Sequence, residues 1–203
     1  MKFIDFFSGI GGFHSGLEQA GMECVGWCEF DKFAQKSYRE MYDTEGMWFS
    51  DDVRKVRGSE LPRADVWAFG FPCQDVSIAG KQRGILIKTA NKQGYAMAYH
   101  GDGVDLAYPN SETRRGRVQP QRANTLTTSD NLGVVLDDGS KVYIRKLTPR
   151  ECWRLQGFTD EQFDKAAAVN SNSQLYKQAG NAVSVNVVAE IGKHIMAVER
   201  GNI

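Results

Sequence analysis

The chain has 203 residues, and its 25 lysines and arginines balance 25 aspartates and glutamates, so the formal net charge is zero. This balance excludes a uniformly basic nucleic-acid-binding protein, and any basic surface must be local. The four cysteines have neither the paired spacing of a zinc site nor the density of a disulfide scaffold, so we expect reduced thiols and no metal. The apolar start, MKFIDFFSGIGGF, is too short for a signal segment or a spanning helix. We therefore expect a soluble cytoplasmic protein with no membrane partner.

The first third of the chain alternates strand and helix patterns. An apolar run at residues 2–8 stops at glycines, and residues 13–21 have helical spacing. Residues 22–30 predict a second strand, and residues 31–42 predict a helix with Asp31 as its N-cap. The apolar run at residues 63–71 is continuous enough for a strand buried on both faces. The alternation predicts an α/β fold, a doubly wound parallel sheet with helices on both faces.

The remainder of the chain has a different pattern. Residues 88–122 are polar and rich in glycine and turn-forming residues, which predicts loops and short strands. Thr148 as N-cap, Pro149 at the first helical position and Glu151 form a capping box, and Gly157 is a candidate stop. A last helix is expected over residues 185–200.

Two acids and a glycine turn predict a cofactor site. The glycines of FSGIGG, residues 7–12, allow a tight strand-to-helix turn that approaches a ligand closely. Glu29 ends the second strand about 20 residues later, where a ribose hydroxyl pair is held in nucleotide-binding folds. Asp52 follows a further strand and is placed to accept a hydrogen bond from an adenine amino group. Each acid alone could be a solvated turn residue, but the two together favour an adenosine cofactor.

Cys73 lies just past the apolar run at residues 63–71, at the carboxyl edge of the predicted sheet, where ligands of open α/β folds bind. Most single cysteines are small core residues. Here Pro72 stiffens the turn, and a polar loop with Ser77, Gly80 and Gly84 follows. This context favours a functional thiol.

Several long motifs, in order, resemble those of the cytosine-5 DNA methyltransferases. They are FSGIGG at residues 7–12, Glu29, Asp52, GFPCQDVSIAGKQRG at residues 70–84, the helix entry at residues 145–158 and QLYKQAGNAVSVNV at residues 174–187. RANTLTTSDNLGVV, residues 122–135, resembles the end of the family's target-recognition region. The resemblance implies a Rossmann-like S-adenosylmethionine-binding fold, with residues 1–84 and 141–203 forming the methyltransferase domain and residues 85–140 a remnant of the recognition region.

The resemblance also implies an activity and its residues. The Cys73 thiolate would add to cytosine C6 in double-stranded DNA, C5 would take the methyl group, and S-adenosylhomocysteine would be released. The loop carrying Ser77, Lys81 and Arg83 would close over the DNA. The expected cofactor contacts are Phe7, Gly9, Gly11, Gly12, Glu29, Asp52, Asn181 and Ala182. A prokaryotic or phage source and a place in restriction–modification fit this family.

The chain departs from the family pattern in its middle. It has no Glu-Asn-Val, whose carboxyl supplies a proton to the cytosine, and no Gln-x-Arg-x-Arg; QPQR at residues 119–122 and RRGR at residues 114–117 are superficial echoes. The junction at residues 84–86 has the character of an internal deletion. Such a deletion would leave the strand before Cys73 as an apolar sheet edge, to be covered by residues 88–122, a second copy or a complementing chain.

Three alternatives to an active DNA methyltransferase stay open. The chain could be an inactive S-adenosylmethionine- or DNA-binding remnant, or one subunit of a split methyltransferase. An RNA substrate would present a flipped cytosine in a similar way. An NAD-dependent dehydrogenase shares the glycine turn and Glu29 but leaves Cys73 and Asn181 without a role.

Overall fold

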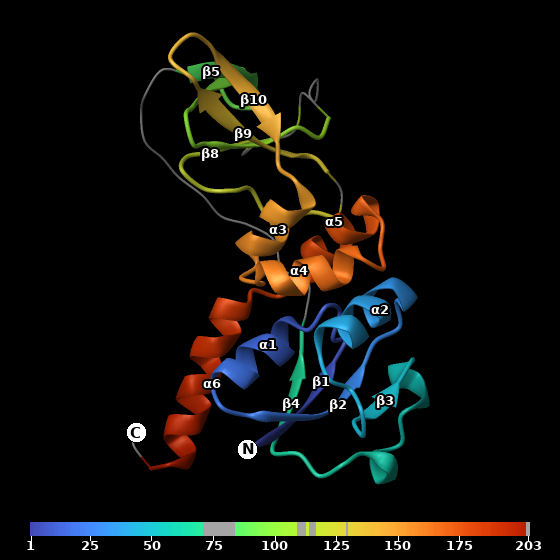
Figure 1. Cartoon of the computed structure of the whole chain (residues 1–203). Coiled ribbons are helices and arrows are strands. Elements are labelled where there is room, and N and C mark those ends of the chain that lie inside the picture. Colours follow the sequence, from blue (N-terminus) through green and yellow to red (C-terminus); the bar gives the residue numbers. More distant parts are fainter. Residues whose placement is uncertain (71–83, 109–112, 114–116, 129, 202–203) are drawn as a thin grey trace.

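The computed structural model describes residues 1–70, 84–108, 113, 117–128 and 130–201. Figure 1 shows a parallel sheet with its helices in one part of the molecule and an antiparallel β region in the other. A group of short helices from the C-terminal third lies between them, and the last helix returns along the side of the parallel sheet. Segments far apart in the sequence therefore meet around the first sheet.

The first sheet contains four parallel strands. They are, in spatial order, β3 (Trp48–Ser50), β2 (Glu23–Cys28), β1 (Lys2–Phe6) and β4 (Val66–Phe69). Since all pairings are parallel, the carboxyl ends of the four strands meet at one edge. The predicted α/β class and parallel sheet are confirmed.

Three helices pack on one face of this sheet. They are α1 (Gly12–Gln19), α2 (Lys32–Met41) and α6 (Val185–Glu199). The predicted N-cap is confirmed, because the Asp31 carboxylate accepts hydrogen bonds from Phe33 N and Ala34 N. Phe3 and Leu17 share an apolar core with Val188 and Met196 of the last helix. Burial of this face holds the C-terminal helix to the N-terminal strands.

The opposite face carries Ile4, Phe6 and Cys28, which pack against Trp48 and against the segment that runs to β4. Two short 3₁₀ helices lie in that segment, η1 (Val53–Lys55) and η2 (Gly58–Glu60). The prediction that residues 63–71 are buried on both faces is wrong for β4, where Trp67 is 56% exposed. Among the described strands, β4 lies at one edge of the first sheet. The helices α1, α2 and α6 cover the face that carries Phe3, and Trp67 lies on the opposite face, in contact with Phe6.

The described residues of the antiparallel region form six strands. β5 (Gly84–Lys88) pairs with β6 (Tyr95–Tyr99), and a second sheet has the order β10 (Val142–Lys146), β9 (Leu132–Asp137), β7 (Gly103–Asp105) and β8 (Val118–Gln119). Ile87, Ala98, Val104 and Val135 form its small core. The expected loops and short strands are confirmed for the described part of residues 88–122.

The helices between the two regions are α3 (Pro149–Leu155), α4 (Asp160–Ala167) and α5 (Asn172–Asn181). The Thr148–Glu151 capping box is confirmed, and Gly157 takes a left-handed φ of 87° past the end of the helix. Trp153 is fully buried and donates its Nε1–H to the Leu175 carbonyl. In the part of the chain that the structure describes, no helix combines the length and the apolarity needed to cross a bilayer.

Candidate functional site

The glycine turn joins β1 to α1 in a conformation that depends on its glycines. Gly9 and Gly11 have left-handed φ values of 55° and 77°, and Phe7, at 54°, is one of few non-glycine residues in that region. A Cβ atom on Gly12 would lie 2.5 Å from the Val183 carbonyl oxygen. The turn is therefore closely packed from behind, while the Phe7 side chain remains 60% exposed.

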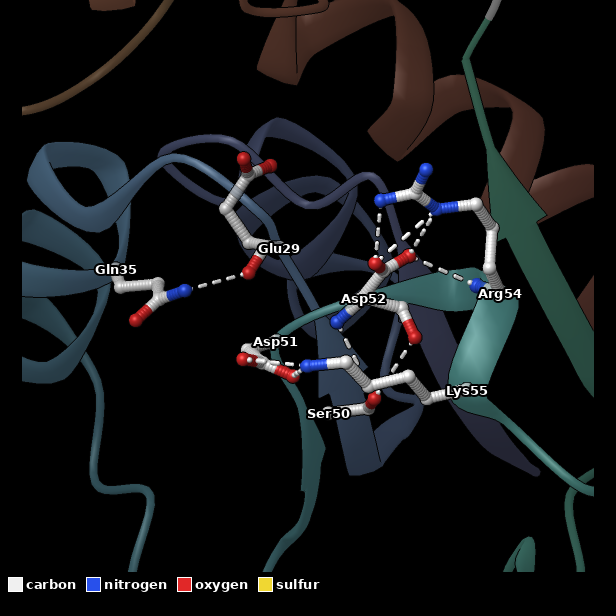
Figure 2. A network of polar contacts seen from close by, with 7 residues as sticks. All are labelled: Glu29, Gln35, Ser50, Asp51, Asp52, Arg54 and Lys55. Atoms are coloured by element: carbon white, nitrogen blue, oxygen red, sulfur yellow. Dashed lines mark hydrogen bonds and ion pairs between the residues drawn. The ribbon is translucent and has the colours of Figure 1, made fainter.

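Glu29 connects the end of β2 to this turn. Its two carboxylate oxygens accept hydrogen bonds from Gly9 N at 2.8 Å and Asp31 N at 2.6 Å. The Gln35 side chain donates to the Glu29 carbonyl at 2.7 Å, so the backbone at this strand end is also fixed (Figure 2). Each carboxylate oxygen keeps a second acceptor position, which a ligand hydroxyl can use.

Asp52 lies beyond β3 and caps η1. Its carboxylate accepts hydrogen bonds from the Arg54 backbone N–H and from the Arg54 guanidinium, which folds back over it in Figure 2. The side-chain hydrogen bond from Arg54 lowers the pKa of Asp52 to about 2. Asp52 is thus a carboxylate throughout the neutral range.

A cavity of about 290 Å³ brings the ends of these elements together. Its lining consists of Phe7, Cys28, Glu29, Phe30, Asp52, Val53 and Arg54. Three predicted cofactor residues, Phe7, Glu29 and Asp52, therefore share one cavity, which is close to the lower end of the usual range for ligand sites, ~300–1,000 Å³. Phe30 is 72% exposed, so the cavity has two large aromatic side chains available for stacking.

Sequence reasoning missed four lining residues, Cys28, Phe30, Val53 and Arg54. Phe30 and Val53 each directly follow one of the predicted acids, and an apolar residue after an acid at a strand end is the signal that could have identified them. Cys28 is buried, and burial, followed by the charge of Glu29, raises the pKa of its thiol to about 11. Cys28 therefore lines the cavity as a neutral thiol near neutral pH and supplies no thiolate.

Asn181 is the last residue of α5, Ala182 begins the short segment that joins α5 to α6, and neither residue lines the cavity. Gln156 positions that segment by donating to the Ala179 and Ala182 carbonyls at 2.8 and 2.9 Å. The segment then passes behind the glycine turn, where Val183 contacts Gly12. The C-terminal motif therefore lies against the glycine turn and is not part of the cavity lining.

The remaining predicted residues belong to the loop that carries Cys73 and to the arginine-containing segments of the polar middle. Cys73, Ser77, Lys81 and Arg83 lie outside the described residues. β4 ends at Phe69, paired with Phe6, so the chain leaves the sheet toward Cys73 at the same edge that carries the cavity. Of the arginine echoes, Arg117 is buried and donates to the Asp105 and Lys88 carbonyls, which is a structural role.

Comparison with known proteins identifies the family of this chain. The sequence profile of the family described as C-5 cytosine-specific DNA methylase matches residues 1–91 and 86–197. The orphan methyltransferase M.Rho11sI of Bacillus phage rho11s is 43% identical over 112 residues, covering 47% of this chain and 22% of the relative. The type II methyltransferase M.HhaI of Haemophilus parahaemolyticus is 42% identical over 84 residues, covering 41% of this chain and 25% of the relative.

Among solved structures, the Entamoeba histolytica methyltransferase EhMeth aligns with a TM-score of 0.59 at 12% identity, covering 98% of both chains. At this identity the likeness concerns the fold alone. The matched part of the present chain spans about a fifth to a quarter of the length of the two curated relatives. The profile match, which covers nearly the whole sequence in two segments, shows that the chain belongs to the C-5 cytosine-specific DNA methylase family.

Proposed function

We propose that this chain takes part in the transfer of a methyl group from S-adenosylmethionine to C5 of cytosine in double-stranded DNA. The observation that carries the proposal is the single cavity lined by Phe7, Glu29 and Asp52 at the carboxyl edge of a parallel sheet. Ligands of open α/β sheets bind at that edge. Membership of the methylase family supports DNA as the nucleic acid.

The chemistry of the cavity fits an adenosine cofactor. Glu29 offers acceptor positions for two ribose hydroxyls, and Asp52 offers one for an adenine amino group. Phe7 and Phe30 supply exposed rings for stacking, and we add Phe30 and Val53 to the contacts predicted from the sequence. Among the described residues, no atom lies within 4 Å of an added Cβ on Gly9, and we propose that the ligand approaches the backbone of the turn there. Gly11 and Gly12 pack against Tyr42 and Val183, and they stay proposed contacts together with Asn181 and Ala182, which directly precede Val183. When bound, S-adenosylmethionine supplies a methyl group on a sulfonium.

We assign the nucleophile to Cys73. In the proposed reaction its thiolate forms a bond to cytosine C6, and the electron pair displaced to C5 takes the methyl group. Loss of the C5 proton to a base then expels the thiolate and restores the ring. Ser77, Lys81 and Arg83 follow in the same loop, and we propose that they contact the DNA once the base is flipped out of the duplex.

The absence of a Glu-Asn-Val motif lowers the rate of methyl transfer that we expect for this chain. General acid–base catalysis contributes about 10²–10⁴-fold, so a chain without that glutamate should turn over slowly unless another group protonates the cytosine. The second candidate function is therefore a cofactor- or DNA-binding protein without activity, or one subunit of a split methyltransferase. The absence of the glutamate from the sequence favours it.

The edge of β4 supports a partner for the split form. Trp67 is 56% exposed on β4, one of the two outer strands among those described, and the described part of residues 88–122 lies in the antiparallel region rather than beside β4 (Figure 1). We propose that a second copy or a complementing chain covers this edge, because an open apolar strand edge favours association. Light scattering of the purified chain, with a Trp67→Lys variant as comparison, should show an oligomer that the variant loses. A monomer in both would contradict the second-copy form.

The sources of the relatives, a Bacillus phage and Haemophilus parahaemolyticus, support a prokaryotic or phage origin, a cytoplasmic location and a place in restriction–modification for this chain as well.

The proposed function is tested by calorimetric titration with S-adenosylmethionine and by incorporation of a tritiated methyl group into mixed-sequence duplex DNA. Binding with incorporation supports the enzyme, and binding without incorporation supports the second candidate. Cys73→Ser should abolish incorporation and leave cofactor affinity unchanged. Equal loss of both would count against its role as nucleophile, and no binding by the wild-type chain would overturn the cofactor assignment.

A further inference from the structure

Arg54 lines the cavity, and the proposed function gives no role to its contacts with Asp52. It follows Asp52 by two positions and folds back so that its guanidinium lies beside the Asp52 carboxylate (Figure 2). The two side chains differ sharply in exposure, 77% for Arg54 and 10% for Asp52. The arginine therefore covers the carboxylate from the solvent side while both residues line the cavity.

The hydrogen bonds between the two residues use most of the acceptor capacity of Asp52. Oδ1 accepts the Arg54 backbone N–H at 3.0 Å and Nε–H at 2.9 Å, which fills its two acceptor positions. Oδ2 accepts Nη2–H at 2.6 Å and only a share of the same Nε proton at 3.1 Å. One acceptor position, on Oδ2, remains for a ligand.

We propose that Arg54 is a positioning residue, which fixes the Asp52 carboxylate so that Oδ2 accepts one N–H donor and the cavity selects a purine with an exocyclic amino group. The proposal rests on the adenosine cofactor assigned above and deepens it. A fork of two parallel N–H donors holds the plane of a carboxylate, which a lone cation does not. Fixing the acceptor before the ligand arrives lowers the entropic cost of binding that ligand.

The charge of Asp52 has a second effect on selection. An aspartate is a carboxylate near neutral pH at its ordinary pKa, and the Arg54 hydrogen bond lowers that pKa further, to about 2, so Asp52 is an acceptor and not a donor. A carboxylate repels a purine that carries a carbonyl oxygen in place of the amino group, since both groups are acceptors. The pair should therefore reject a hypoxanthine ring.

Lys55 provides a matched control. It is the next residue in η1 and, like Arg54, it pairs with a neighbouring aspartate, with its Nζ 2.8 Å from an Asp51 oxygen. Neither Lys55 nor Asp51 lines the cavity. Lys55→Gln and Arg54→Gln each remove one positive surface charge, but only Arg54→Gln removes the guanidinium hydrogen bonds to Asp52.

The experiment is calorimetric titration with S-adenosylhomocysteine and with S-inosylhomocysteine, whose purine carries a carbonyl oxygen in place of the amino group and a proton on N1. A hydrogen bond to a charged group corresponds to roughly a 10- to 150-fold change in affinity, so the wild-type chain should prefer the adenosyl ligand by at least about tenfold. Arg54→Gln should reduce that preference to a few-fold at most, chiefly by weakening the adenosyl ligand. Arg54→Lys should retain an intermediate preference because its ammonium can reach one oxygen only, and Lys55→Gln should match the wild type.

Other outcomes would overturn the proposal in distinguishable ways. If Arg54→Gln weakened both ligands equally, Arg54 would be structural only. If it bound the adenosyl ligand more tightly than the wild type, Arg54 would compete with the amino group for Asp52. If the wild-type chain bound neither ligand, the proposed cofactor function would fail and this inference with it. An unchanged urea midpoint for Arg54→Gln shows that the variant is folded, as the exposure of Arg54 leads us to expect.

Discussion

Gly16 lies where the helix α1 packs closely on the helix α6, and Gly16→Ala tests whether this contact holds the last helix to the first sheet. A Cβ atom on Gly16 would lie 2.5 and 2.6 Å from Cβ and Cγ1 of Val188 and 2.8 Å from the Val185 carbonyl oxygen. Val188 is buried and β-branched, so its χ1 has little freedom, and the Val185 oxygen belongs to the backbone. The added methyl group therefore has no low-energy position unless the helices separate.

Two effects of opposite sign decide the magnitude. Alanine is favoured over glycine inside a helix by about 0.5–1 kcal/mol. Overpacking a closely packed core costs about 1–3 kcal/mol. Since all three contacts are below 3 Å and one involves the backbone, we expect the overpacking cost to be the larger effect, with a net loss of about 1–2 kcal/mol in the free energy of unfolding.

Urea unfolding followed by tryptophan fluorescence measures this loss, and the matched control is Gly58→Ala. Gly58 lies in a 3₁₀ helix, has no neighbouring atom within 4 Å of an added Cβ and does not have a left-handed φ. The control should stay within about 0.5 kcal/mol of the wild type. If Gly16→Ala were as stable as the wild type or more stable, the close packing of α1 and α6 would be refuted.

Three further predictions follow from single contacts. Glu29→Gln should weaken S-adenosylhomocysteine binding by about 1.5–3 kcal/mol in calorimetry, because the amide offers one acceptor oxygen in place of two, and an unchanged affinity would remove its assignment to the ribose. The side-chain hydrogen bond from Arg145 lowers the pKa of Glu151 to about 2 from its usual 4.5, so its contribution to stability is complete above pH 4.5 and is lost as the pH falls toward 2. Glu151→Gln, which can still form a capping box, should therefore show a shallower fall in urea midpoint between pH 4.5 and 2, and an unaltered slope would contradict the ion pair. Burial raises the pKa of three thiols, so iodoacetamide at pH 8 should label them only after unfolding, as mass spectrometry of the native and denatured chain can check; these are Cys24, Cys28 and Cys152.

The parts of the fold that the sequence predicts are those where one local rule acts alone. The Asp31 N-cap and the Thr148 capping box each satisfy backbone N–H groups within three residues, so the local sequence alone is enough to predict them. The strands of the first sheet are short apolar runs between glycines and polar residues, and they were predicted for the same reason. Glu29 and Asp52 were found because both follow such runs, and parallel strands end at one edge.

The helices α4 and α5 were not predicted, although α4 has a Thr159–Gln162 capping box and two acids in its first turn, a local signal that could have identified it. α5 contains Gly180, whose added Cβ would lie 2.3 Å from the Thr127 carbonyl oxygen, so tertiary contact and not helix propensity determines this residue. The burial of β4 was predicted wrongly, since an apolar run does not reveal which face the helices leave uncovered. Arg54 was missed because a surface arginine two residues after an acid has no distinguishing pattern until the backbone turns at η1.

The contacts of the C-terminal segment explain why cofactor binding and turnover should be separable in this chain. The glycine turn, Glu29 and Asp52 come from the first 52 residues, and Gln156 and Val183 support the turn from more than 140 residues away. α6 then packs on α1 and closes the same core. The contacts named here that shape the cavity lie outside the polar middle, and the sequence of that middle contains no Glu-Asn-Val. If the proposed loss of the proton donor is right, it would leave the supports of the cofactor cavity in place, and affinity for S-adenosylhomocysteine should persist in preparations that transfer no methyl group.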